Sequence, residues 1–402
     1  MGLEFLNESG SNMSIHDTTR RGFLGGIGGF SAAAAVSGGF RDFYFAALRK
    51  NGIVGSTFLL LRENAASAKE VYGYSELASK RLVDWSTCYH WASITKTFTA
   101  IAVMQLRDHG RLRLDDAVSY YVPEIKQVHN PYGPVESIAI RHLLTHSAGF
   151  RGPTWPWRTE PWQPFEPTKW SQIVAMLPYT NVDFRPGSRH SYSNLGIVFL
   201  GQIIERLTDD DYEVYVDKNI LKPLEMYQSY FDQSPYHLLR YRSHSYFLEK
   251  GKLREAPFNF DTGITVSNGG LNAPFPDMEK YLRFLLGNQQ DDRYEGILKR
   301  STLEEMFGKQ LEVPSSDSSQ LAGTRGRDSI GLAFFRHEQG GRLYIGHGGN
   351  QNGFLSHFYL DPQSRRAYVV AYNTDATDET RNTSRLDLDI RDHLMTRDLA
   401  VD

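Results

Sequence analysis

The amino-acid sequence predicts a mixed α/β (α+β) fold, in which helices flank an antiparallel sheet built from strands near both ends of the chain. Residues 52–64 and 69–77 form a hairpin pattern that is rich in β-branched and aromatic residues. Three later segments alternate apolar and polar residues between turn residues: 342–349, 353–361 and 366–373. From about 111 to 300 the pattern is mostly helical, which indicates a helical insertion between the two halves of the sheet.

Several helices can be placed in and around this insertion. Apolar periodicity favours helices over 137–150 and 195–207. A further helix is expected over 272–287, with Asp277 as its N-cap and Gly287 as its end. The tail of the chain, 376–399, is also compatible with a helix.

Composition is that of a globular protein and argues against several functional classes. The 402 residues are 40% hydrophobic and 23% charged, which allows a substantial core. The formal net charge is −3 and no basic run stands out, so nucleic acid is not an expected partner. The single cysteine, Cys88, excludes an intrachain disulfide and is expected to be a buried core residue. The 13 histidines contain no H-E-x-x-H pattern, and neither a metal nor a cofactor is expected.

The first 40 residues have the composition of an export signal. Arg20 and Arg21 precede a 14-residue uncharged stretch, 22–35, whose alanines suit signal cleavage. Paired arginines followed by Gly, Phe and Leu are typical of bacterial twin-arginine signals. This stretch is too short to span a bilayer, and no later segment reaches 18 apolar residues, so no membrane span is expected in the mature protein. We therefore expect a signal at 1–40, a folded domain at 41–402, and a periplasmic or secreted location.

A serine and a lysine begin the apolar segment SITKTFTA, residues 93–100. Ser93 and Lys96 are three residues apart and therefore share one face of the predicted helix. A serine hydroxyl is a weak nucleophile until a neighbouring base accepts its proton, and a lysine can do so where an apolar environment lowers its pKa. Alone, the pattern is common by chance, and a capping serine beside an exposed lysine is the alternative.

Two further motifs occur later in the chain. In YSN, residues 192–194, Tyr192 could act as a general base and Asn194 could hold a substrate carbonyl. In GHGG, residues 346–349, the glycines allow close backbone approach, and His347 could donate to a substrate or tune the tyrosine. The alternatives are a core tyrosine, a helix-capping asparagine and an ordinary tight turn.

In this order, the three motifs resemble those of the serine β-lactamase and penicillin-binding-protein superfamily. The resemblance is to its class C-like branch, which includes family VIII carboxylesterases and D-amino-acid-cleaving peptidases. Five more stretches resemble this branch, so the resemblance covers about residues 50–375: RLRLDDAVSYYVPEI, IAIRHLLTHSAGF, FRPGSRHSYSNLGIVFLGQIIERLT, LKPLEM and NGGLNAPFPDMEKYLRFL. It implies a β-lactamase/transpeptidase-like fold. An α/β-hydrolase is disfavoured, because no G-x-S-x-G occurs and THSAG, residues 145–149, lacks the first glycine.

The resemblance implies a role for each residue of the first two motifs. Ser93 matches the acylated nucleophile, and Lys96 matches the lysine that shares its proton. Tyr192 matches the general base of the family, and Asn194 matches the amide that orients the substrate. These four residues are therefore the predicted centre of an acyl-transfer site.

The third motif departs from the family pattern. His347-Gly348-Gly349 stands where many true β-lactamases have Lys-Thr-Gly, so a permanent ammonium and a hydroxyl are both missing. Since those groups would hold the carboxylate of a β-lactam or a peptide, their loss favours other substrates. By the same resemblance, the backbone N–H groups of Ser93 and Asn350 would form the oxyanion hole.

A tryptophan-rich segment precedes the second motif. Residues 152–170 hold four of the six tryptophans, interleaved with prolines. In the resembling family this region borders the active-site cleft, where an aromatic loop would suit an apolar acyl or aryl substrate. A small core beneath a long loop is an equally good interpretation.

These observations favour an exported serine hydrolase that cleaves small-molecule esters or amides through an acyl-enzyme on Ser93. Peptidoglycan-derived amides are among the candidate substrates, and an esterase or peptidase-like activity is favoured over a dedicated β-lactamase. The alternatives are a β-lactamase, a transacylase that uses an alcohol or amine in place of water, and a non-catalytic relative that binds cell-wall fragments. The intact set of Ser93, Lys96 and Tyr192 argues against the last of these.

Replacing Arg20 and Arg21 together by lysine is expected to abolish export, because the twin-arginine route depends on the arginine pair. Fractionation of a bacterial host that expresses the full chain would then find the variant in the cytoplasm and the parent outside it. Arg41→Lys, a substitution beyond the signal, is the matched control. Unchanged export of the double variant would mean that another route operates.

Overall fold

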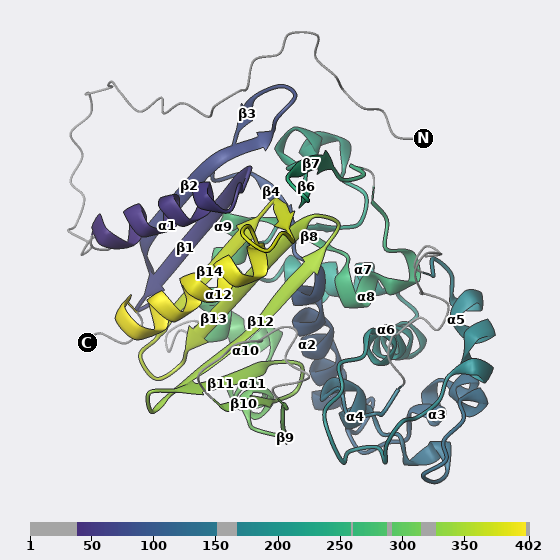
Figure 1. The fold of residues 1–402 in the computed structure, drawn as a ribbon. Coiled ribbons are helices and arrows are strands. Elements are labelled where there is room, and N and C mark those ends of the chain that lie inside the picture. The colour runs from purple at the N-terminus through teal and green to yellow at the C-terminus, as the bar shows by residue number, and fades with distance from the viewer. Residues whose placement is uncertain (1–37, 151–166, 259, 288–291, 315–326, 399–402) are drawn as a thin grey trace. The chain divides into compact units, whose positions relative to one another are not determined.

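A nine-stranded antiparallel sheet is the main feature of the protein in the computed structural model (Figure 1). The structure describes residues 38–150, 167–258, 260–287, 292–314 and 327–398. The strands lie in the order β3-β2-β1-β14-β13-β12-β11-β10-β9. In chain order they are β1 (Gly55–Arg62), β2 (Ala65–Glu76), β3 (Arg81–Leu82), β9 (Leu311–Glu312), β10 (Arg327–Ile330), β11 (Phe335–Gln339), β12 (Arg342–Gln351), β13 (Phe354–Asp361) and β14 (Arg366–Tyr372).

The two ends of the chain meet in the middle of this sheet. Strand β1 pairs with β14 so that Ser56 lies opposite Tyr372 and Arg62 lies opposite Arg366. Strands β1, β13 and β14 are buried almost throughout, since helices cover both faces. The predicted sheet of N- and C-terminal strands is therefore confirmed.

Alternate side chains of β1 enter two different cores. Phe58 and Leu60 pack in the core between the sheet and the helices α1 (Gly38–Lys50) and α12 (Thr383–His393). Figure 1 shows these two helices beside the sheet. Leu59 and Leu61 point to the other face, towards α2 (Thr95–Asp108) and α9 (Phe275–Leu286). Helix α2 is buried on all sides from Thr95 to Leu106, so it passes through the interior between the sheet and the helical insertion.

The helical insertion is built around α6 (Asn194–Thr208), which packs against α2, α4 and α8. The other helices described here are α3 (Val118–Tyr121), α4 (Ile140–Leu144), α5 (Trp170–Met176), α7 (Tyr212–Val216), α8 (Val266–Gly269), α10 (Asp292–Ile297) and α11 (Arg300–Phe307). Two small sheets accompany them: β4 (Cys88–His90) with β8 (Leu271–Pro274) and β5 (Tyr230–Phe231), and β15 (Thr374–Ala376) with β6 (Tyr246–Glu249) and β7 (Lys252–Glu255). The prediction of a mainly helical insertion is confirmed.

The helix predicted over 137–150 is confirmed only at Ile140–Leu144, which is α4, and is wrong before and after it. Helix α4 ends at Leu144, because Thr145 leaves the helical conformation and His146 has a φ of +50°. The chain then turns through Gly149, whose φ is +85° and whose missing Cβ would crowd the Phe184 carbonyl oxygen. The apolar periodicity of this segment therefore reflects a buried loop.

The predicted cap of α9 is also wrong, although its end is right. Pro274 occupies the N-cap position and Asp277 lies inside the first turn. The Asp277 carboxylate accepts hydrogen bonds from the Gln228 N–H and the Ser229 hydroxyl, both at 2.9 Å. It therefore binds a neighbouring loop and, through Lys280 Nζ at 3.2 Å, its own helix, but it does not cap that helix. Gly287 ends α9 with a φ of +76°, as predicted.

The remaining expectations concern the ends of the chain and Cys88. Cys88 is buried in β4, as predicted, and burial raises the pKa of its thiol to about 12. The tail forms β15 and α12 and one further turn, 394–398. Most of the expected signal, residues 1–37, and most of the tryptophan-rich segment, 151–166, lie outside the described residues.

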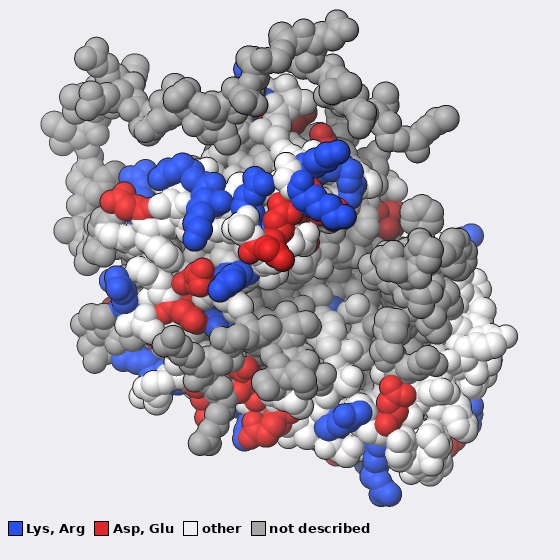
Figure 2. All heavy atoms as spheres, in the orientation of Figure 1, with Lys and Arg blue, Asp and Glu red and all other residues white. Residues whose placement is uncertain are grey.

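The described surface offers two further observations. Figure 2 shows basic and acidic side chains interspersed on the face of the molecule drawn there. Among the helices that the structure describes, none combines the length and the apolar character needed to cross a membrane.

Candidate active site

Ser93 occupies an exposed position within a buried stretch of chain. Every residue from Thr87 to Leu106 is buried except Ser93, which is partly exposed. It lies in a short 3₁₀ turn, η1 (Ala92–Ile94), directly before α2. Ala92 has a φ of +46°, a conformation that is costly for a residue with a Cβ and that clusters at functional sites. The chain therefore bends sharply to bring one hydroxyl to the surface.

Two neighbouring strands and the Trp91 side chain hold this turn. The Trp91 backbone N–H donates to the Leu271 carbonyl and its indole N–H to the Ala273 carbonyl, both at 2.8 Å. Both acceptors belong to β8, which also pairs with β4 just before the turn. The position of Ser93 is therefore fixed by backbone hydrogen bonds on the side of the turn that precedes it.

Lys96 lies beside Ser93, as the sequence predicts. The ammonium Nζ donates to Ser93 Oγ at 2.9 Å and to the Asn268 carbonyl oxygen at 2.7 Å. The Lys96 side chain is fully buried, where an ammonium is costly unless oxygen atoms replace its water. Asn268, in α8, is a site residue that the sequence analysis missed; it lies in the run VSNGGL, part of which carried the family resemblance without an assigned role.

Tyr192 joins this pair from the loop before α6. Its ring centre lies 5.1 Å from Lys96 Nζ. Burial raises the pKa of Tyr192, and interaction with the Ser93 side chain offsets part of the rise. The phenol oxygen is buried and has no hydrogen-bond partner within 3.5 Å among the described residues. Tyr192 therefore holds its own proton in the resting site.

Asn194 is the first residue of α6 and does not cap it. Ser193 is the N-cap, and its hydroxyl accepts from the Gly196 N–H at 3.2 Å. The Asn194 side-chain oxygen is buried without a hydrogen-bond partner in the described part of the chain. The capping alternative for Asn194 is therefore excluded, and its amide is not used by the helix.

The third motif lies on β12, which contacts η1. The His347 side chain is fully buried, and its Nδ1–H donates to the Gly348 carbonyl oxygen at 2.6 Å. Burial, followed by the nearby Lys96 ammonium, lowers the pKa of His347 to about 3. His347 is therefore uncharged at neutral pH, and its side chain does not lie on the open surface.

Gly349 and Asn350 follow the His347-Gly348 pair on the same strand. A Cβ on Gly349 would overlap the Trp91 carbonyl oxygen, so only glycine lets β12 approach the turn that carries Ser93. The Asn350 side chain is exposed and donates to the Asp375 carboxylate at 3.3 Å. The predicted role of Asn350 uses its backbone N–H, which this side-chain contact leaves untouched.

A second residue missed by the sequence analysis, His146, packs beneath Tyr192. The two ring centres are 4.4 Å apart, and His146 comes from the segment THSAG that follows α4. The signal was present in the family-like stretch IAIRHLLTHSAGF, but its periodicity was interpreted as a helix. Within the described ranges, no group of three or more His, Cys, Asp or Glu side chains could hold a metal ion.

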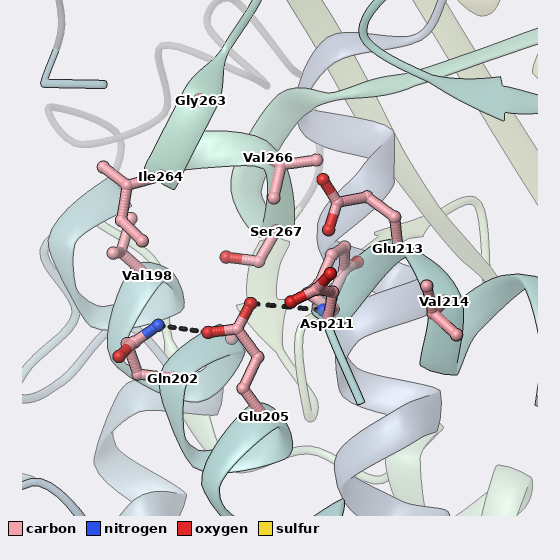
Figure 3. A pocket seen from close by; sticks show the side chains of 12 residues that line it. Val198, Gln202, Glu205, Asp211, Glu213, Val214, Gly263, Ile264, Val266 and Ser267 are labelled. Atoms are coloured by element: carbon pink, nitrogen blue, oxygen red, sulfur yellow. Dashed lines mark hydrogen bonds between the residues drawn. The ribbon is translucent and has the colours of Figure 1, made fainter. Parts of the chain in front are cut away.

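A separate cavity of about 380 Å³ lies between α6, α7 and the turn Gly263–Thr265 (Figure 3). Glu205 and Glu213 line it, and burial raises the pKa of both carboxyls. Glu205 accepts hydrogen bonds from the Tyr212 N–H at 3.1 Å and from the Gln202 side chain. Of the described residues that line this cavity, none belongs to the predicted site.

Comparison with known proteins identifies the family. A sequence profile described as beta-lactamase matches residues 40–391. The chain belongs to the beta-lactamase family. Protein flp of Staphylococcus aureus (strain COL) is 25% identical over 346 residues, which are 86% of this chain and 65% of that protein. The chain thus spans 65% of the length of the curated relative it matches.

Solved structures share the fold. The octameric penicillin-binding protein homologue from Pyrococcus abyssi aligns with a TM-score of 0.73 and 25% identity, over 89% of this chain and 77% of that chain. A class C beta-lactamase in complex with cefoxitin aligns with a TM-score of 0.68 and 18% identity, over 88% of this chain and 98% of that chain. These likenesses confirm the predicted class C-like fold.

Gly349→Ala is expected to lower the free energy of unfolding by about 1–3 kcal/mol, because the added Cβ overlaps backbone that cannot easily move. Gly296→Ala is the matched control: it lies in α10, has open space around its Cβ position, and should be neutral or stabilising by about 0.5–1 kcal/mol. Urea unfolding of the three proteins measures both effects. Equal stability of Gly349→Ala and the parent would contradict the close contact between β12 and η1.

Proposed function

We propose that the protein is a serine hydrolase that cleaves an ester or amide bond through an acyl-enzyme on Ser93, with an esterase or peptidase-like activity rather than dedicated β-lactam hydrolysis. One observation carries the proposal. Ser93 alone is partly exposed between Thr87 and Leu106, and its hydroxyl lies 2.9 Å from the Lys96 ammonium. A structural serine has no need of a buried lysine, whereas a nucleophile needs a group that handles its proton.

The proton of Ser93 passes through Lys96 and Tyr192 acting as a pair. The Lys96 ammonium and the Tyr192 phenol must first lose one proton between them. Because the two groups lie close together, their titrations are coupled, and the loss is a property of the pair. Ser93 Oγ then attacks the carbonyl carbon of the substrate. The proton of the Ser93 hydroxyl moves to the deprotonated Lys96–Tyr192 pair. When the tetrahedral adduct collapses, the leaving alkoxide or amine takes that proton, and Ser93 stays acylated. A water molecule repeats both steps and releases the acid.

In the tetrahedral adduct the substrate carbonyl oxygen carries negative charge, which N–H donors stabilise. By family resemblance these are the backbone N–H groups of Ser93 and Asn350, and the contact of β12 with η1 supports such a pairing. One donor of this kind is worth about 2.7–4 kcal/mol to the transition state. Asn194, which is not consumed as a helix cap, would orient the substrate carbonyl or amide.

The third motif supports a preference for substrates without a carboxylate. His347 is buried and uncharged at neutral pH, since its pKa is lowered to about 3. Gly348 supplies no hydroxyl. A carboxylate placed beside the reacting bond would therefore find neither a permanent ammonium at position 347 nor a hydroxyl at position 348. If Arg20 and Arg21 direct export, the protein would act on its substrates outside the cytoplasm.

Incubation with a fluorophosphonate is expected to label Ser93 alone, because among the described serines only Ser93 combines partial exposure with a hydrogen bond from a lysine. Ser93→Ala should abolish labelling, and Lys96→Met should slow it by about 100-fold or more, as loss of an acid–base group does. Ser86→Ala, a serine seven residues away, is the control that should label like the parent. Peptide mapping by mass spectrometry that finds the adduct elsewhere would refute Ser93 as the nucleophile.

A short-chain p-nitrophenyl ester is expected to give a higher kcat/KM than nitrocefin on the same preparation. Loss of one charge-assisted hydrogen bond to the β-lactam carboxylate costs about 1.5–3 kcal/mol, or one to two powers of ten. The neutral ester needs no such bond. Penicillin G and a penicillin methyl ester form a matched pair that isolates the carboxylate. If nitrocefin is the better substrate, the enzyme is a β-lactamase and this role of His347 and Gly348 is wrong.

A further inference from the structure

His146 holds both residues that flank Tyr192. The Ser191 N–H donates to the His146 carbonyl oxygen at 2.7 Å. The Ser193 N–H donates to His146 Nδ1 at 3.2 Å. The imidazole ring packs on the phenol ring between them, with 4.4 Å between the ring centres and an angle of 34°. His146 therefore contacts the backbone of Ser191, the ring of Tyr192 and the backbone of Ser193.

The backbone of His146 is adapted to this contact. Its φ of +50° is uncommon for a residue with a Cβ, although histidine and asparagine adopt it more readily than most. This conformation turns the carbonyl and the imidazole of the same residue towards one short segment. The side chain is 1% exposed, so no solvent replaces its hydrogen bonds. Strain of this kind persists where the surrounding structure requires it.

The protonation state of His146 follows from its partners. Since Nδ1 accepts the Ser193 N–H, the ring proton must be on Nε2, which has no hydrogen-bond partner among the described residues. Burial lowers the pKa of His146, and so do the neighbouring His190, Lys96 and His347. A charged imidazole would carry a proton on Nδ1 and could no longer accept from Ser193.

We propose that His146 is the positioning residue for Tyr192, holding its phenol against Ser93 and Lys96 through the two backbone hydrogen bonds and the ring contact. The inference rests on the proposed function, because it assigns to His146 the placement of one member of the proton-transfer pair. Tyr192 has no hydrogen bond of its own to fix its phenol among the described residues, so its position depends on its backbone and on packing. His146 supplies both.

Two substitutions separate the acceptor from the ring. His146→Asn keeps an acceptor close to the position of Nδ1 and tolerates the positive φ, whereas His146→Phe keeps an aromatic ring and has no acceptor. We expect His146→Phe to lower kcat for a p-nitrophenyl ester by about 100-fold with KM changed less than about threefold, as small misplacements of a catalytic group do. His146→Asn should recover at least about tenfold of that loss. Equal rates for His146→Phe and the parent, or for the two variants, would overturn the proposal.

The Tyr192→Phe background distinguishes positioning from a general effect on folding. If His146 acts through Tyr192, adding His146→Phe to Tyr192→Phe changes the remaining rate less than about twofold, because the two losses are not additive. Fully additive losses would overturn the proposal. Tyr192→Phe alone tests the proposed function: parental rates in this variant would remove Tyr192 from the proton transfer, irrespective of the His146 results.

Nitrogen-15 NMR of the unaltered protein tests the protonation state of His146 without relying on any activity measurement. At neutral pH, the signals of His146 should be those of the neutral ring with its proton on Nε2 and an acceptor at Nδ1. A proton on Nδ1 would break the hydrogen bond from Ser193 and overturn the proposal. Assignment uses His146→Asn, in which this one set of histidine signals disappears.

Discussion

The buried ammonium of Lys96 is the interaction on which the arrangement of the site depends. It bridges the Ser93 hydroxyl and the Asn268 carbonyl, and so links the turn before α2 to α8 in the helical insertion. A buried cation deprived of either oxygen would be costly, which means that the two segments cannot separate without penalty. The same contact places the Ser93 hydroxyl beside the amine that the proposed mechanism uses for proton transfer. If that mechanism holds, one pair of hydrogen bonds serves both stability and chemistry.

The same charge determines the state of the groups around it. Lys96 contributes to the lowered pKa of both His146 and His347, in each case after burial. With both imidazoles uncharged, the described residues at the centre of the site are the cationic Lys96 and several neutral donors and acceptors. An uncharged imidazole can accept a hydrogen bond, and His146 uses this capacity for Ser193. A site of this kind orders its residues through hydrogen-bond direction more than through ion pairs.

The parts of the fold and site that could be predicted are those with a periodic or local signal. The strands at both ends, α6 and the end of α9 follow from alternation, helical periodicity and a glycine stop. The contact of Ser93 with Lys96 follows from a spacing of three residues. By contrast, the Asn268 carbonyl contacts Lys96 across 172 residues and carries no side-chain signal, because any residue type has that oxygen. The contact of His146 with Tyr192 could not be predicted, because a buried loop and a buried helix can have the same apolar periodicity.

The pairing of β1 with β14 has a consequence for the life of the chain before it is complete. The Ser56 hydroxyl bonds to the Ala371 carbonyl at 2.7 Å, 315 residues away, in the middle of the sheet. During synthesis the inner edge of the first hairpin therefore stays unpaired until β14 has been made, 315 residues after Ser56. Until then a long apolar strand edge stays open to other chains. A ribosome-bound fragment that ends before β12 also lacks Gly349 and thus the strand that packs behind the serine turn. Both the pairing of that edge and the approach of Gly349 to the turn therefore await β12, β13 and β14, residues 342–372. The synthesis of these three strands is the step at which a chaperone would have to protect the open edge.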